Sequence, residues 1–138
     1  DYFGTIAYYR LVFPQVKKVI KGIFHHGFGN ARTKGAKLIK RARIMEGFKA
    51  NIICMAHDDS KTLDVSQVLD LDEEGRLYYE KVYLGAPGSF QKAYKVGEAH
   101  GGYAESMMFA PNDLGVISFE FKIEKKNNKP YLHWRGSL

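Results

Sequence analysis

The order of apolar and polar positions predicts helices near the start of the chain. In residues 14–24 the apolar side chains recur at intervals of three and four, at Val16, Val19, Ile20, Ile23 and Phe24. This spacing places them on one face of a helix. Pro14 suits the first helical turn, where its missing N–H has no partner to lose, and Gly27 and Gly29 are typical of a helix end. The pattern therefore predicts a first helix over residues 14–24.

A second helix is predicted over residues 30–47. Asn30 is a suitable N-cap, and Gly47 suits the end of the helix. Its expected apolar stripe comprises Ala31, Leu38, Ile39, Ala42 and Met45. We expect the remaining positions, which are almost all cationic, to face solvent.

The rest of the chain alternates with the period of a strand. Leu63, Val65, Leu69 and Leu71 share one parity, and Ile117, Phe119, Phe121 and Ile123 do the same in the clearest strand, 116–125. Turn residues separate these runs. The predicted strands are 51–56, 63–71, 77–84, 90–96, 103–110, 116–125 and 131–135, and the aromatic segment 2–13 is predicted to be a strand or an extended arm.

These elements predict one α+β domain over residues 1–138. Two N-terminal helices would pack on a mostly antiparallel sheet of about five to six strands. Within it, residues 1–13 form the aromatic strand or arm, 14–49 a basic helical block, and 50–138 the antiparallel sheet. A chain of 138 residues is of ordinary domain size.

Positive charge is concentrated in the block 14–49. It holds ten Lys and Arg residues against one acid, Glu46, whereas the whole chain carries a net charge of only +6, so the remainder is net negative. Such asymmetry indicates an anionic partner, because Lys and Arg neutralise phosphates. The same block also suits peripheral contact with an anionic membrane, although no apolar run is long enough to span one.

The sequence therefore favours a non-catalytic domain that binds a polyanion, most plainly RNA or DNA. The expected contacts come from the exposed faces of the two helices, and exposed aromatic side chains would stack on bases. The candidate residues are Lys34, Lys37, Lys40, Arg41, Arg43, Lys17, Lys18 and Lys21.

Two other functions are consistent with the sequence. The first is a structural or assembly subunit that makes protein contacts through the aromatic arm and open sheet edges. The second is a small metal-dependent nuclease, since Asp113, Glu120 and Lys122 resemble the metal-binding carboxylates and lysine of PD-(D/E)xK nucleases. Alternating charge on a solvated strand face accounts equally for these three residues.

We expect no cofactor and no metal. Cys54 is the single cysteine, and no second pair of ligands complements its spacing to His57. The segment from Asp70 to Gly75 resembles the start of a calcium loop, but Lys81 stands where a carboxylate is needed. The single cysteine is compatible with a reducing intracellular compartment and leaves the localisation open.

Overall fold

The computed structural model describes residues 5–28, 33–57, 60–89, 94, 106–108, 111 and 113–138. Its elements, in chain order, are strand β1 (Ile6–Phe13), the 3-10 turn η1 (Pro14–Val16), β2 (Lys18–His25), helix α1 (Lys34–Gly47), β3 (Ile52–Met55), β4 (Thr62–Leu71), β5 (Leu77–Ala86), β6 (Ser118–Lys126) and β7 (Lys129–Ser137).

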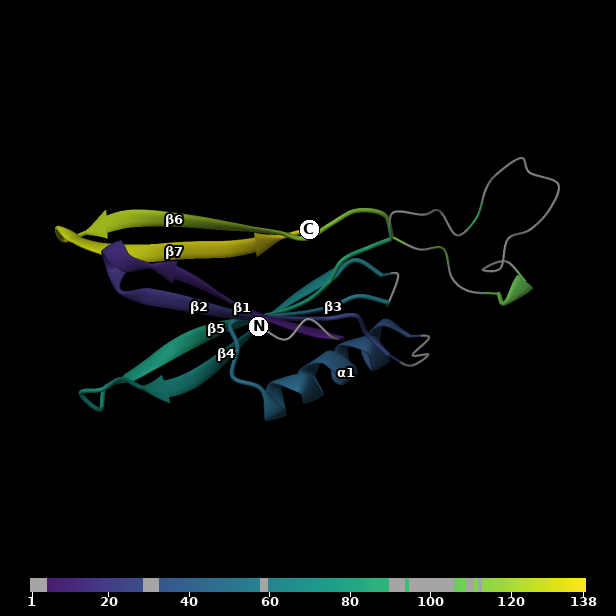
Figure 1. The fold of residues 1–138 in the computed structure, drawn as a ribbon, viewed down its shortest axis with the longest axis horizontal. Helices are drawn as coiled ribbons and strands as arrows, with labels where there is room; N and C mark the ends of the chain where they lie inside the picture. Colours follow the sequence, from purple (N-terminus) through teal and green to yellow (C-terminus); the bar gives the residue numbers. More distant parts are fainter. Residues whose placement is uncertain are drawn as a thin grey trace.

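The strands form a five-stranded sheet and a separate hairpin. The sheet has the order β1-β2-β3-β5-β4, and β6 pairs only with β7. The β2–β3 and β3–β5 pairs are parallel, whereas β1–β2 and β4–β5 are antiparallel hairpins. The β6–β7 hairpin lies over one face of the sheet and α1 over the other, so the described part of the chain forms three layers (Figure 1).

A separate group of core residues lies on each face of the sheet. On the hairpin-side face, Ile20, Ile52, Cys54 and Tyr83 pack with Trp134 of β7. The Tyr83 and Trp134 ring centroids are 4.8 Å apart. On the helix-side face, the buried residues Ile53, Val82 and Leu84 pack against Leu38, Ile44, Met45 and Ala50. Strand β3 and the second half of β5 are therefore buried on both faces.

The predicted fold class is wrong in two respects. The described residues contain one α-helix rather than two N-terminal helices, and the sheet is mixed rather than mostly antiparallel. Residues 14–24, predicted to be a helix, form the turn η1 and strand β2. Because β2 buries an apolar side chain on each face, Ile20 and Ile23, its apolar residues fall at both parities and mimic a helical spacing. The β-branched side chains Val19, Ile20 and Ile23 suit the strand.

One glycine explains how the first hairpin packs. Tyr9 of β1 and Gly22 of β2 are register partners, and a Cβ atom added at Gly22 would fall on the Tyr9 ring. The ring crosses this position and stacks on Phe24, with 4.8 Å between ring centroids. Gly22 is thus required by close approach of a neighbouring side chain.

The helix predicted over 30–47 is present, although it begins later and presents a different face. It begins at Lys34, where the side chain of Thr33, rather than Asn30, accepts a hydrogen bond from the Ala36 N–H at 3.2 Å. Ile39 is 57% exposed, so it does not belong to the packed face as predicted. The residues of α1 that pack on the sheet are Leu38, Arg41, Ile44 and Met45.

The other predicted strands are confirmed where they are described, as β1, β3, β4, β5, β6 and β7. The predicted strands 90–96 and 103–110 fall mostly outside the described residues. Of their few described positions, none is in a strand. No helix within the described ranges has the length and apolar character needed to cross a membrane.

Candidate functional site

The five predicted binding residues of α1 are not equivalent. Lys34 lies in the first turn, and its side chain is outside the described part of the structure. Lys37 donates a hydrogen bond from Nζ to Ser60 Oγ at 3.1 Å. Lys40 donates to the Phe28 carbonyl oxygen at 2.5 Å, and its Nζ lies 5.2 Å from the centroid of the Phe28 ring. Arg43 is exposed on the outer face.

Arg41 was expected on the solvent face, and this expectation is wrong. Its side chain is 1% exposed and points toward the sheet, where Nη2 donates to Thr62 Oγ1 of β4 at 2.7 Å. The residue follows Leu38 by three positions and precedes Met45 by four, so it shares their face of the helix. Arg41 therefore joins α1 to β4 and does not present its charge to an external ligand.

The three lysines predicted on a first helix lie on the first hairpin instead. Lys17 occupies the turn with φ of 50°, and Lys18 pairs with Glu80 Oε1 at 3.7 Å. Lys21 is exposed on the helix-side face of β2. The cations of the basic block are thus distributed over a turn, a strand and a helix, and they do not form one continuous helical surface.

One of these lysines belongs to a cluster that the linear sequence does not reveal. In the β1–β2 register Arg10 stands directly opposite Lys21, so two cations share one face of an antiparallel pair. Both side chains are exposed, and neither forms an ion pair among the described residues. Like charges in this arrangement repel, which makes the pair a site of uncompensated positive potential.

Aromatic rings lie beside this pair, and the backbone of Lys49 passes next to it. Tyr8, two residues before Arg10 on the same face, packs against Phe48, with 6.2 Å between ring centroids. Lys49 is exposed and lies between Phe48 and Asn51, and Asn51 Oδ1 accepts a hydrogen bond from the Lys21 N–H at 2.9 Å. The residues Tyr8, Arg10, Lys21, Phe48 and Lys49 are called the basic–aromatic patch below.

The rings of this patch are accessible. Tyr8 is 45% exposed and Phe48 is 38% exposed, although each contacts the other. Exposed rings among unpaired cations offer both stacking surfaces and phosphate contacts. Sequence reasoning missed Arg10 because it stands in an otherwise apolar segment. The signal that identifies it is the hairpin register, which follows once Pro14–Val16 is recognised as a turn.

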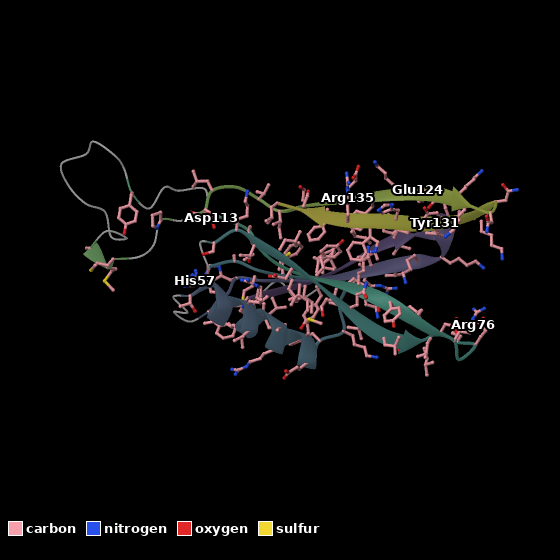
Figure 2. The ribbon with its side chains drawn as sticks, turned by 180° about the vertical axis from the view of Figure 1, so that it is seen from behind. His57, Arg76, Asp113, Glu124, Tyr131 and Arg135 are labelled. Atoms are coloured by element: carbon pink, nitrogen blue, oxygen red, sulfur yellow. The ribbon has the colours of Figure 1, made fainter. Side chains whose placement is uncertain are left out.

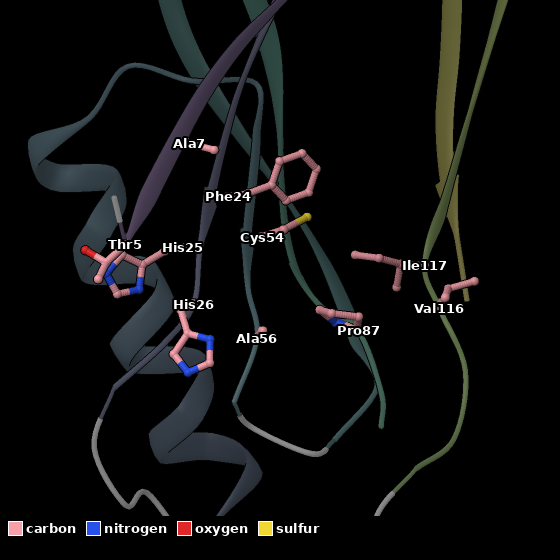
Figure 3. A pocket seen from close by; sticks show the side chains of 10 residues that line it. All are labelled: Thr5, Ala7, Phe24, His25, His26, Cys54, Ala56, Pro87, Val116 and Ile117. Atoms are coloured by element: carbon pink, nitrogen blue, oxygen red, sulfur yellow. The ribbon is translucent and has the colours of Figure 1, made fainter. Parts of the chain in front are cut away.

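A cavity of about 440 Å³ opens on the hairpin-side face, where β2, β3 and β5 end (Figure 3). Its lining is mainly apolar, from Phe24, Ala56, Pro87 and Ile117 among others, and its polar groups are Thr5, His25, His26 and Cys54. The Gly27 N–H donates to His25 Nδ1 at 2.7 Å, so Nε2 carries the proton when this ring is neutral. Burial raises the pKa of the Cys54 thiol to about 12, which keeps it protonated and unreactive at neutral pH.

The carboxylates of the nuclease-like motif are engaged in other contacts. The Glu120 carboxylate forms ion pairs with Lys122 Nζ at 3.0 Å and with Arg135 Nε at 2.8 Å. The hydrogen bonds from these two cations lower the pKa of Glu120. Asp113 Oδ2 accepts from the Lys61 N–H at 3.2 Å. In Figure 2, Asp113 lies at one end of the β6–β7 hairpin layer, whereas Arg135, which binds Glu120, lies along strand β7. No group of three His, Cys, Asp or Glu side chains in the described ranges is placed to hold a metal ion.

Comparison with known proteins finds no matching family model, no matching curated protein and no matching solved structure.

Proposed function

We propose that this protein binds single-stranded nucleic acid through the basic–aromatic patch. The observation that carries the proposal is the exposed Arg10–Lys21 pair, two directly opposed cations that no described acid neutralises. A phosphate bound between them would replace their mutual repulsion with attraction to both.

The patch favours a single strand over a duplex for a geometric reason. Its cations are interleaved with the rings of Tyr8 and Phe48, which lie on the same face of the sheet. Unstacked bases of a single strand have free faces for these rings, whereas the bases of a duplex are already stacked on each other. Stacking of this kind is largely independent of base identity, so the proposal is of a binder with weak sequence preference.

The test is fluorescence anisotropy with labelled oligo-U and oligo-dT and with a duplex of equal length, each over a salt series. We expect tighter binding to the single strands and an affinity that falls with salt, with a log–log slope of about −0.7 for each phosphate contacted. Replacing Arg10 and Lys21 together by Gln should reduce the magnitude of that slope by about 1.4, because two contacts are lost.

The matched control is the pair Lys126 and Lys129. These exposed lysines are also register partners, and they flank the turn of the β6–β7 hairpin without an ion pair among the described residues. Their replacement by Gln removes the same charge from another part of the molecule. An equal loss of binding in both double variants would show that only net charge matters, and that result would refute the proposed site. Absence of binding at low salt would refute the function itself.

A further inference from the structure

The outer half of the β4–β5 hairpin carries an apolar surface that no described residue covers. Its five large apolar side chains are between 52% and 72% exposed. In the antiparallel register Leu69 faces Tyr79, and Leu71 faces Leu77. All five share one parity and therefore one face, which is called the hairpin apolar face: Val65, Leu69, Leu71, Leu77 and Tyr79.

This face continues the hairpin-side core of the sheet. Leu63 and Tyr83 have the same parity, and both lie beneath the β6–β7 hairpin, where Gly136 approaches them closely and Trp134 packs on Tyr83. Beyond Tyr83 the two hairpins diverge toward separate tips (Figure 1). The row of alternating apolar residues on β4 thus continues beyond the part of the sheet that the β6–β7 hairpin covers. A surface of this kind is typical of a contact with another protein chain.

The charges around the face are complementary to one another. The hairpin tip holds four acids, Asp70, Asp72, Glu73 and Glu74, against Arg76 alone. Between β5 and β7 lies a groove of about 410 Å³ whose lining includes Lys18, Glu80 and Lys81, and Lys18 is paired with Glu80. Lys81 is exposed on the hairpin apolar face, opposite Gln67, and forms no ion pair among the described residues.

We propose that the occupant of the hairpin apolar face is the same face of a second copy of this chain. The two hairpins would pack face to face and antiparallel about a two-fold axis, as in an isologous dimer. In that arrangement the acidic tip of each copy points toward the Lys81 side of its partner. One surface then supplies both the apolar contact and the opposite charges, which an unrelated partner would have to supply separately.

The test is sedimentation equilibrium of the whole chain, without nucleic acid, from micromolar to millimolar concentration. We expect a monomer–dimer equilibrium. Replacing Val65 and Leu69 together by Thr, which keeps the strand propensity, should weaken the dimer at least tenfold. The control is Val12→Thr on β1, because Val12 is 58% exposed and Val65 is 55% exposed, and only Val65 lies on the proposed interface.

A charge exchange tests the orientation of the two copies. Glu73 is exposed at the tip and forms no ion pair among the described residues. Glu73→Lys and Lys81→Glu should each weaken the dimer, and the double variant should recover much of the loss. A monomer throughout the concentration range, an equal effect of Val12→Thr, or no recovery in the double variant would each overturn the proposal. Because no nucleic acid is present, these results are independent of the test of the proposed function.

Discussion

The Lys21→Gln substitution should stabilise the folded protein while it weakens nucleic-acid binding. Lys21 and Arg10 are directly opposed on β1 and β2, and neither is paired with an acid in the described part of the chain. The backbone contact to Asn51 survives the substitution, because it uses the Lys21 N–H. Gln keeps the first two of the four methylene groups and a polar end, so the principal change is the removal of one of two like charges.

The expected magnitude follows from Coulomb's law. Two unit charges about 8 Å apart in water repel by about 0.5 kcal/mol, which lies within the range of about 0.2–1 kcal/mol measured for cross-strand pairs. The free energy of unfolding should therefore rise by roughly this amount in low salt. In about 1 M salt the gain should disappear, because the screening length falls to about 3 Å.

The assay is urea unfolding at two salt concentrations, beside a binding isotherm with oligo-U. Lys122→Gln provides a control of opposite sign, since Lys122 lies 3.0 Å from Glu120 and its loss removes an attraction. A Lys21 variant that is less stable than the parent in low salt would refute the reasoning. A stability gain that persists unchanged in high salt would show that the gain has a different origin.

Two further predictions concern the hairpin-side core. Gly22→Ala should lower the free energy of unfolding by about 1–3 kcal/mol, because the added methyl group collides with the Tyr9 ring. In a Tyr9→Ala background this cost should largely vanish, as a double-mutant cycle in urea would measure. Equal costs in both backgrounds would show that the Tyr9 ring does not occupy the space above Gly22. Because burial raises the pKa of Cys54 from 9.0 to about 12, the unfolded chain loses this proton at lower pH than the folded one. Stability should therefore fall as pH rises from about 9 to 12, and Cys54→Ala should reduce that fall relative to the parent.

The sequence predicted the strands well where one face is buried and the other is solvated. In β6 and at Ile117, just before it, the parity of the apolar residues is as expected: Ile117, Phe119 and Phe121 pack on the sheet, while Glu120 and Lys122 pair on the outer face. The prediction failed for β2 because it buries an apolar residue on each face, Ile20 on one and Ile23 on the other. Adjacent apolar pairs four residues apart, Val19–Ile20 and Ile23–Phe24, are then compatible with a helix and with a strand, and only tertiary contacts distinguish the two.

The burial of Arg41 illustrates a second limit. Charge alone placed this residue on the solvent face of α1, since arginine is rarely buried without a partner. One of its partners is Thr62, which is 21 residues away in sequence; Arg41 Nη2 lies 2.7 Å from Thr62 Oγ1 because β4 pairs with the buried strand β5. Local periodicity contains no information on that pairing. Sequence reasoning therefore could not show that Arg41 is buried whereas Arg43 is exposed.

The basic–aromatic patch depends on two steps that differ in how far the sequence determines them. The first is local: once the chain turns at Pro14–Val16, the pairing of Phe13 with Lys18 places Arg10 opposite Lys21. The second is tertiary, because Phe48 and Lys49 reach this face only after α1 has crossed the sheet and returned the chain to Asn51, beside Lys21. A count of charges along the chain includes Lys21 and Lys49 but gives no reason to combine them with Arg10. The site is therefore a property of the hairpin register and of the path of the chain after α1, and the helical block predicted from the sequence does not produce it.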